Sequence, residues 1–117
     1  MSPKRILVVD DEPLVCELIA ELCRNDRHEV ETATSPDEAI EFCRKRHFDL
    51  LFLDYYLANV TGDQVVTAVR GSNAKQRIVL MSGHRPYPPI GEADFFIRKP
   101  CTADVIRDAI ARFAEPA

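Results

Sequence analysis

Runs of consecutive apolar residues alternate along the chain with segments whose apolar residues recur at helical spacing. The runs at residues 6–9, 50–53, 78–81 and 95–97 are bounded by polar residues, and a shorter one covers 30–33. Such runs are typical of strands that are buried on both faces of a parallel sheet. The alternation of the two patterns predicts an α/β fold, with a five-stranded parallel sheet covered by helices on both sides.

Four of the intervening segments predict helices. The first has Pro13 near its start, and Ser35-Pro36-Asp37-Glu38 is a capping box with proline at the first helical position of the second. A short third helix is expected from about 63 to 70, and Thr102 caps the last one. The apolar positions at helical spacing are Leu14, Val15, Leu18, Ile19 and Leu22 in the first helix, Ala39, Ile40 and Cys43 in the second, Val65, Val66 and Val69 in the third, and Val105, Ile106, Ala109, Ile110 and Phe113 in the last.

The segment from 83 to 94 is expected to lack a full helix. It contains Pro86, Pro88, Pro89 and Gly91. A proline in a helix interior costs about 3 kcal/mol and a glycine about 1 kcal/mol, and no apolar stripe is present to offset this. A mean helix takes about 11 residues, and two loops must fit into the same segment. We therefore expect a helix here to be absent or reduced to one turn, with residues 86–89 extended.

Acidic residues directly follow two of the predicted strands. Asp10 and Asp11 come after the run 6–9, and Asp54 comes after 50–53. In open α/β folds, ligands bind at the edge of the sheet where the strands end, so we expect these carboxylates to meet there. They would repel one another unless a hard cation joined them, and Mg²⁺ prefers one or two carboxylates together with water and phosphate oxygens. Taken singly, each aspartate is better explained as a cap of the helix that follows it.

Two more polar residues at strand ends change this balance. Ser82 follows the run 78–81, and Lys99 follows the run 95–97 after one arginine. Lys99 could neutralise a bound phosphoryl group, and Pro100 biases it toward extended backbone geometry. Acids, a hydroxyl and a lysine at four strand ends together predict a metal-dependent phosphoryl site.

Length and charge narrow the classes of function. The 117 residues fit one domain, residues 1–117, with a single core. The net charge of −4 argues against direct nucleic-acid binding, which usually needs a basic face, and the basic run Arg44-Lys45-Arg46 suits a helix end. No apolar stretch approaches the ~20 residues of a membrane span, and the N-terminus has no signal-peptide core. We therefore expect a cytoplasmic protein with no membrane partner.

The four cysteines do not have the spacing of a zinc site. Cys16, Cys23 and Cys43 lie within helical patterns, so we expect them to be reduced and mostly buried. Cys101 follows Lys99-Pro100 beside the predicted site and is expected to be more exposed.

Four segments together resemble the receiver domain of response regulators in two-component signalling. They are Ile6-Leu7-Val8-Val9-Asp10-Asp11-Glu12-Pro13, Leu53-Asp54 with Gly62 eight positions on, Met81-Ser82-Gly83, and Phe96-Ile97-Arg98-Lys99-Pro100. They occur in order with helix-length spacers, and the resemblance covers essentially the whole chain. It implies a flavodoxin-like, doubly wound sheet with the strand order 2-1-3-4-5.

The resemblance also implies that Asp54 is a phosphoacceptor, because a carboxylate is a competent nucleophile for a phosphoryl group. The donor would be a phosphohistidine on a histidine kinase or a phosphotransfer protein. Asp10, Asp11, Asp54 and the backbone carbonyl of Tyr56 match ligands of Mg²⁺. The chain would be no conventional enzyme, since it would catalyse only its own phosphorylation and dephosphorylation.

Three further positions match groups that respond to the phosphoryl group. Ser82 and Lys99 match residues that contact its oxygens, and Phe96 matches an aromatic residue that rotates inward when the hydroxyl moves. Such a switch is a shift between two populations that is biased by charge at one site. From the sequence alone, Phe96 fits an ordinary core aromatic equally well.

Some positions depart from the pattern of the family. Leu57-Ala58 stands where most receivers have Met-Pro, which leaves that loop less rigid, and Ser82 stands for the commoner threonine. Tyr56 and His84 lie two positions after the phosphoacceptor and the switch hydroxyl, where the family admits the attacking water. Their bulk predicts a long-lived phosphorylated state.

Two other classes of function stay open. A Mg²⁺-dependent aspartyl-phosphate phosphohydrolase would need an acid two residues after its nucleophile as general acid and base, where this chain has Tyr56. A pseudo-receiver would bind a partner without being phosphorylated, and the intact set of acids, hydroxyl and lysine argues against it. Because no output domain follows Ala117, we expect a stand-alone receiver or phosphate shuttle.

Overall fold

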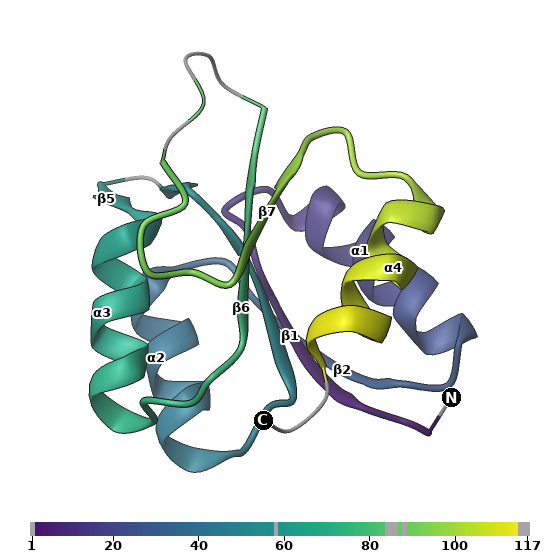
Figure 1. Cartoon of the computed structure of the whole chain (residues 1–117), viewed down its shortest axis with the longest axis horizontal. Coiled ribbons are helices and arrows are strands. Elements are labelled where there is room, and N and C mark those ends of the chain that lie inside the picture. The colour runs from purple at the N-terminus through teal and green to yellow at the C-terminus, as the bar shows by residue number, and fades with distance from the viewer. Residues whose placement is uncertain (1, 58, 84–86, 88, 115–117) are drawn as a thin grey trace.

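A five-stranded parallel sheet forms the centre of the molecule, as the apolar runs predicted. The computed structural model describes residues 2–57, 59–83, 87 and 89–114. The strands of the sheet are β1 (Arg5–Val9), β2 (Glu29–Ala33), β3 (Leu50–Asp54), β6 (Ile78–Ser82) and β7 (Phe95–Arg98). They lie side by side in the order β2-β1-β3-β6-β7 (Figure 1). Counted along the chain, this is the flavodoxin-like order 2-1-3-4-5.

Helices cover both faces of the sheet (Figure 1). The pair on one face is α1 (Pro13–Asn25) and α4 (Ala103–Phe113), and the pair on the other is α2 (Pro36–Lys45) and α3 (Gly62–Ser72). Successive strand residues point to opposite faces, so Ile6 packs in the core beneath α1 and α4, and Leu7 in the core beneath α2 and α3. Burial on both sides explains why the strands read as unbroken apolar runs. Of the helices described, none is long and apolar enough to cross a membrane.

Side chains cap the helices at the starts that the sequence indicated. Ser35 Oγ accepts the backbone N–H of Glu38 at 3.2 Å, and Thr102 Oγ1 accepts the backbone N–H of Val105 at 3.3 Å. At α3 the side chain of Gln64 accepts the N–H of Thr61 at 3.1 Å, an N-terminal cap that was not predicted. The third helix is accordingly longer than expected, because it begins at Gly62 and ends at Ser72.

The helix α1 buries a different stripe from the one that its leucines indicated. Leu14 and Leu18 are 79% and 69% exposed. The buried residues of α1 are instead Cys16, Ile19, Ala20 and Cys23. The small side chains on this stripe allow the helix to approach the sheet closely, and the larger leucines are left outside. In α4, Val105 was likewise expected to face inward and is 40% exposed. Both buried cysteines are free thiols, as predicted.

The segment between β6 and β7 has no helix among its described residues, Gly83, Tyr87 and 89–94. Gly91 adopts a positive φ of 58°, a geometry that favours glycine and interrupts a helix. This confirms the prediction that helix 4 of the family's usual pattern is degenerate in this chain. Of the stretch 86–89 that was expected to be extended, Pro86 and Pro88 lie outside the described residues.

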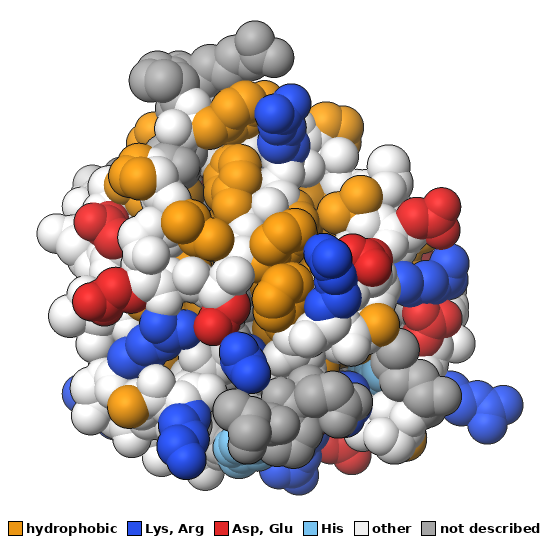
Figure 2. Space-filling view, viewed as in Figure 1, with side chains coloured by type: hydrophobic (Ala, Val, Ile, Leu, Met, Phe, Trp, Pro, Cys, Tyr) orange, Lys and Arg blue, Asp and Glu red, His pale blue; other side chains and the backbone are white. Residues whose placement is uncertain are grey.

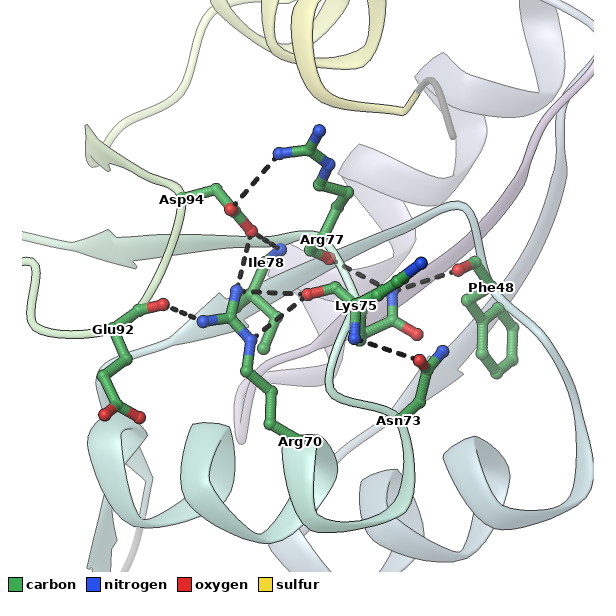
Figure 3. A network of polar contacts seen from close by, with 9 residues as sticks. Phe48, Arg70, Asn73, Lys75, Arg77, Ile78, Glu92 and Asp94 are labelled. Atoms are coloured by element: carbon green, nitrogen blue, oxygen red, sulfur yellow. Dashed lines mark hydrogen bonds and ion pairs between the residues drawn. The ribbon is translucent and has the colours of Figure 1, made fainter. Parts of the chain in front are cut away.

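A single arginine anchors the end of this segment (Figure 3). The guanidinium of Arg70, on α3, donates to the carbonyl oxygens of Gln76 and Glu92 and to the carboxylate of Asp94 at 2.9 Å. The Asp94 carboxylate also accepts the backbone N–H of Ile78 at 2.7 Å, and its backbone N–H bonds the carbonyl oxygen of Ile78 at 2.9 Å. The network therefore ties the segment to α3 and to the start of β6 without a helix of its own.

Replacing Arg70 by methionine should destabilise the fold. The change removes hydrogen bonds to a charged group, each worth about 1.5–3 kcal/mol, and leaves Arg77 as the other cation near Asp94. We expect the free energy of unfolding, measured by urea denaturation, to fall by about 1–3 kcal/mol. Arg44→Met is the matched control, because Arg44 is exposed on α2 and its loss should change stability by less than ~0.5 kcal/mol. Equal effects of the two changes would contradict the anchoring role.

The turn after α1 places Arg27 in the left-handed region, with φ of 69°. The N–H of Arg27 bonds the carbonyl oxygen of Arg24 at 2.9 Å, and the N–H of His28 bonds that of Cys23 at 3.0 Å. These two bonds form a Schellman motif, in which glycine is the usual residue at the left-handed position. A side chain there costs roughly 1–2 kcal/mol.

The change Arg27→Gly should therefore stabilise the protein. Relief of the left-handed strain exceeds the extra entropy of glycine in the unfolded chain, which is about 0.5–1 kcal/mol. We expect the free energy of unfolding to rise by about 0.5–1 kcal/mol in a urea titration. Arg24→Gly, inside the helix, should lower it by about 1 kcal/mol, and a fall in both variants would argue against strain at Arg27.

Candidate functional site

The polar residues predicted at strand ends lie together at one edge of the sheet. The ladder between β1 and β3 pairs Val9 with Leu53, so Asp10 and Asp54 follow at the same level. The ladder between β3 and β6 pairs Asp54 with Met81, which places Ser82 one residue beyond. Asp10, Asp54 and Ser82 are 0%, 4% and 0% exposed. The structure thus brings the predicted acids and hydroxyl to one buried position.

Lys99 bridges the two buried acids from the end of β7. Its Nζ lies 2.5 Å from Asp10 Oδ2 and 3.3 Å from Asp54 Oδ1. Its backbone N–H bonds the carbonyl oxygen of Ser82 at 3.0 Å, which fixes the strand end from which the side chain reaches. One ammonium group therefore faces two carboxylates in a buried setting.

The protonation equilibria of the site reflect this excess of negative charge. Burial, and next the charge of Asp10, raise the pKa of Asp54 to about 6 against the opposing effect of Lys99. Burial alone would lower the pKa of Lys99, but its hydrogen bond to Asp10 and the charges of Asp54 and Asp10 outweigh it and raise that pKa. Asp54 Oδ1 accepts no hydrogen bond from the described residues. The site can accommodate a further positive charge at Asp54.

Three consecutive acids offer oxygen ligands for a cation. Carboxylate oxygens of Asp10, Asp11 and Glu12 lie within 4.8 Å of one another, and Asp11 and Glu12 are exposed toward solvent. Asp10 Oδ1 accepts the backbone N–H of Glu12 at 3.0 Å, which leaves Oδ2 for Lys99. An all-oxygen set with one open side suits Mg²⁺. Glu12 was not among the predicted ligands, although it directly follows the acid pair.

A cleft of about 720 Å³ opens above these groups. One wall holds Asp11, Glu12, Asp54 and Lys99, and the other is a hairpin of β4 (Tyr56–Leu57) and β5 (Val60–Thr61). Tyr56, 38% exposed, lines the cleft two residues after Asp54. The hairpin was not predicted, because strands of two residues leave no period in the sequence.

Gly62 closes the base of this hairpin. Its N–H bonds the carbonyl oxygen of Tyr55 at 2.6 Å. A Cβ added to Gly62 would lie 2.9 Å from the Cα of Tyr55, closer than side-chain carbons approach backbone. The position eight residues after Asp54 therefore needs glycine for a close approach of two backbone segments.

The remaining site residues from the sequence lie apart from the acids. Phe96 is half-buried on β7, with its ring centroid 5.7 Å from that of Tyr87. The guanidinium of Arg98 lies 4.9 Å from the ring centroid of Tyr87 and continues this stack. His84, expected to shield the site, lies outside the described residues. The roles of Ser82, Phe96 and His84 stay predictions.

Comparison with known proteins supports a single family. The model of the response regulator receiver domain matches residues 6–111. The alginate biosynthesis transcriptional regulatory protein AlgB of Pseudomonas syringae is 31% identical over 117 residues, which cover 95% of this chain and 26% of that protein. The probable transcriptional regulatory protein TcrX of Mycobacterium tuberculosis is 30% identical over 81 residues, or 69% of this chain and 35% of that protein. The chain thus spans about a quarter to a third of the length of these relatives.

Solved structures agree with the fold. A response regulator receiver domain protein from Methanospirillum hungatei superposes with a TM-score of 0.87 at 21% identity, over 97% of this chain and 94% of that one. The response regulator TrrA of Thermotoga maritima, solved in complex with Mg²⁺ and BeF, gives a TM-score of 0.84 at 28% identity, over 94% and 98% of the two chains. The chain therefore belongs to the response regulator receiver domain family, whose members are signalling modules of two-component systems rather than conventional enzymes.

Proposed function

We propose that this chain is a phosphorylation-activated receiver that accepts a phosphoryl group on Asp54 in the cytoplasm and then controls a partner protein. The observation that carries the proposal is the placement of a buried carboxylate at a strand end, with Lys99 Nζ 3.3 Å from its Oδ1 and Asp10 at the same level. The donor would be a phosphohistidine of a histidine kinase or a phosphotransfer protein. An oxygen of Asp54 attacks phosphorus, the P–N bond breaks, and its electron pair stays on the imidazole nitrogen.

Asp10, Asp11, Asp54 and the backbone carbonyl of Tyr56 would hold Mg²⁺ in this reaction. The hard oxygen donors and the excess of negative charge around Asp54 support this assignment. When bound, Mg²⁺ supplies positive charge to the oxygens of the transferred group. The exposed carboxylate of Glu12 beside Asp11 would orient water around the ion.

Lys99 would supply the second positive charge. It bridges Asp10 and Asp54, and a phosphoryl group on Asp54 would compete with Asp10 for its ammonium. Ser82, buried at the next strand end, would donate its hydroxyl to a phosphoryl oxygen. Its movement would free space for Phe96, and the shift at β7 would reach the surface.

The alternatives fit the site less well. A phosphohydrolase of the aspartyl-phosphate type would need an acid at position 56, and the residue that lines the cleft there is a tyrosine. A pseudo-receiver would gain nothing from a buried carboxylate whose ionised form is disfavoured by burial, since an apolar residue there would be more stable.

Phosphorylation should occur at Asp54 alone. Incubation with acetyl phosphate and Mg²⁺ should add one phosphate, measured by intact mass, and Asp54→Asn should add none because amide oxygen is no nucleophile for this transfer. Asp37→Asn, in the exposed first turn of α2, is the matched control and should be labelled as the wild type is. Labelling of Asp54→Asn, or labelling that persists in EDTA, would refute the proposal.

The bulk of Tyr56 should prolong the phosphorylated state. Its side chain lines the cleft beside Asp54, where it restricts the approach of water to phosphorus. The change Tyr56→Ala should therefore speed the loss of phosphate several-fold after the donor is removed, as followed by intact mass. Tyr56→Phe keeps the ring and should behave as the wild type does. An unchanged rate in the alanine variant would show that the ring shields nothing.

A further inference from the structure

The strand β7 is the outer strand of the sheet on the side where the family's usual helix is missing. It pairs with β6 alone in the described chain. Figure 1 shows β7 between the chain segment that leads into it and α4, with its outer edge toward the viewer. An outer strand presents unpaired N–H and C=O groups, which proteins usually cover or protect.

The hydrogen-bonding groups that point outward can be assigned. The backbone N–H of Asp94 bonds the carbonyl oxygen of Ile78, so Asp94, Phe96 and Arg98 turn their groups toward β6. The alternation along a strand then turns the N–H and C=O of Phe95 and Ile97 away from the sheet. These four groups form the template that the edge offers.

Apolar side chains accompany this edge. They gather along the middle of the face in Figure 2, between the two helix layers. Phe95 and Phe96 are half-buried, and Ile90 and Val105 are 41% and 40% exposed. A groove of about 520 Å³ runs along β7 against α4, and its lining includes Arg98 as well as Asp104 of α4. The edge is thus apolar at its centre and carries charges of both signs at its rim.

We propose that β7 pairs antiparallel with β7 of a second copy of this chain, so that two sheets join into one across a two-fold axis. With the axis at Phe96, the residues Phe95 and Ile97 of one copy stand opposite Ile97 and Phe95 of the other. Their outward N–H and C=O groups then form four hydrogen bonds between the copies. Phe96 stands opposite Phe96 of the second copy in a non-hydrogen-bonded pair, where side chains lie closest.

The charges at the ends of the strand fit the same register. Asp94 stands opposite Arg98 of the second copy, and the two-fold axis repeats this pair. Asp94 and Arg98 lie on the same face of β7, because they are an even number of residues apart. The pairing of opposite charges selects a second copy rather than an unrelated strand, because one chain supplies both partners in the correct order.

The other edge of the sheet shows the contrast. The outer strand β2 carries Glu29 and Glu31, which pair with Arg5 and Arg46 of the same chain. A second copy placed against β2 would bring these acids close together, and like charges opposite each other destabilise a ladder. Self-pairing is therefore directed to β7. It needs no phosphoryl group and is independent of the function proposed above.

Sedimentation of the unphosphorylated chain over a series of concentrations tests the proposal. The wild type should convert from monomer to dimer, and Arg98→Glu should weaken the dimer by about ten-fold or more, because two attractive pairs become repulsive ones. Arg44→Glu makes the same change of charge on α2 and should dimerise as the wild type does.

Amide hydrogen exchange on the wild type tests the register without a variant. The amides of Phe95 and Ile97 should exchange more slowly as the protein concentration rises. A monomer at every concentration would overturn the proposal, as would equal weakening by Arg98→Glu and Arg44→Glu. A dimer in which these two amides stay unprotected would also overturn it, since the copies would then meet at another surface.

Discussion

The contact of Lys99 with Asp10 and Asp54 is the interaction on which the site depends. The parallel ladder between β1 and β3 forces two carboxylates to the same level of one edge, and burial prevents water from separating their charges. A single lysine neutralises half of that charge. The remaining half raises the pKa of Asp54 to about 6 and leaves one of its oxygens without a hydrogen-bond donor among the described residues. The sheet thus holds a local electrostatic deficit that a cation and a phosphoryl group can complete together.

Much of this arrangement could be predicted because it follows from strand registration. An acid directly after a buried run has little choice of place, and four such strand ends in an α/β fold meet at one edge. The stripe of α1 could not be predicted in this way. Leucines and small residues both recur at helical spacing there, and the distance between helix and sheet decided that Ala20 and Cys23 are buried and Leu18 is exposed.

The hairpin at the cleft shows a second limit of sequence reading. Its strands have two residues each, so they carry no periodic signal, and only the glycine at position 62 pointed to a close approach. The prolines between β6 and β7 were informative for the opposite reason. Each excludes helical geometry by its own covalent structure, so no tertiary contact can overrule it.

The network around Arg70 also bears on how this chain can change. In a protein with a full helix between β6 and β7, many packed positions along that helix hold β7 in place, and each restricts which residues are accepted. Here Arg70 and Asp94 do so through a few hydrogen bonds to the main chain. The residues just before Asp94 are thereby released from packing requirements. New loop lengths and sequences can be tried there at small risk to folding, which makes this stretch the natural place for a lineage, or an engineer, to install a new recognition specificity.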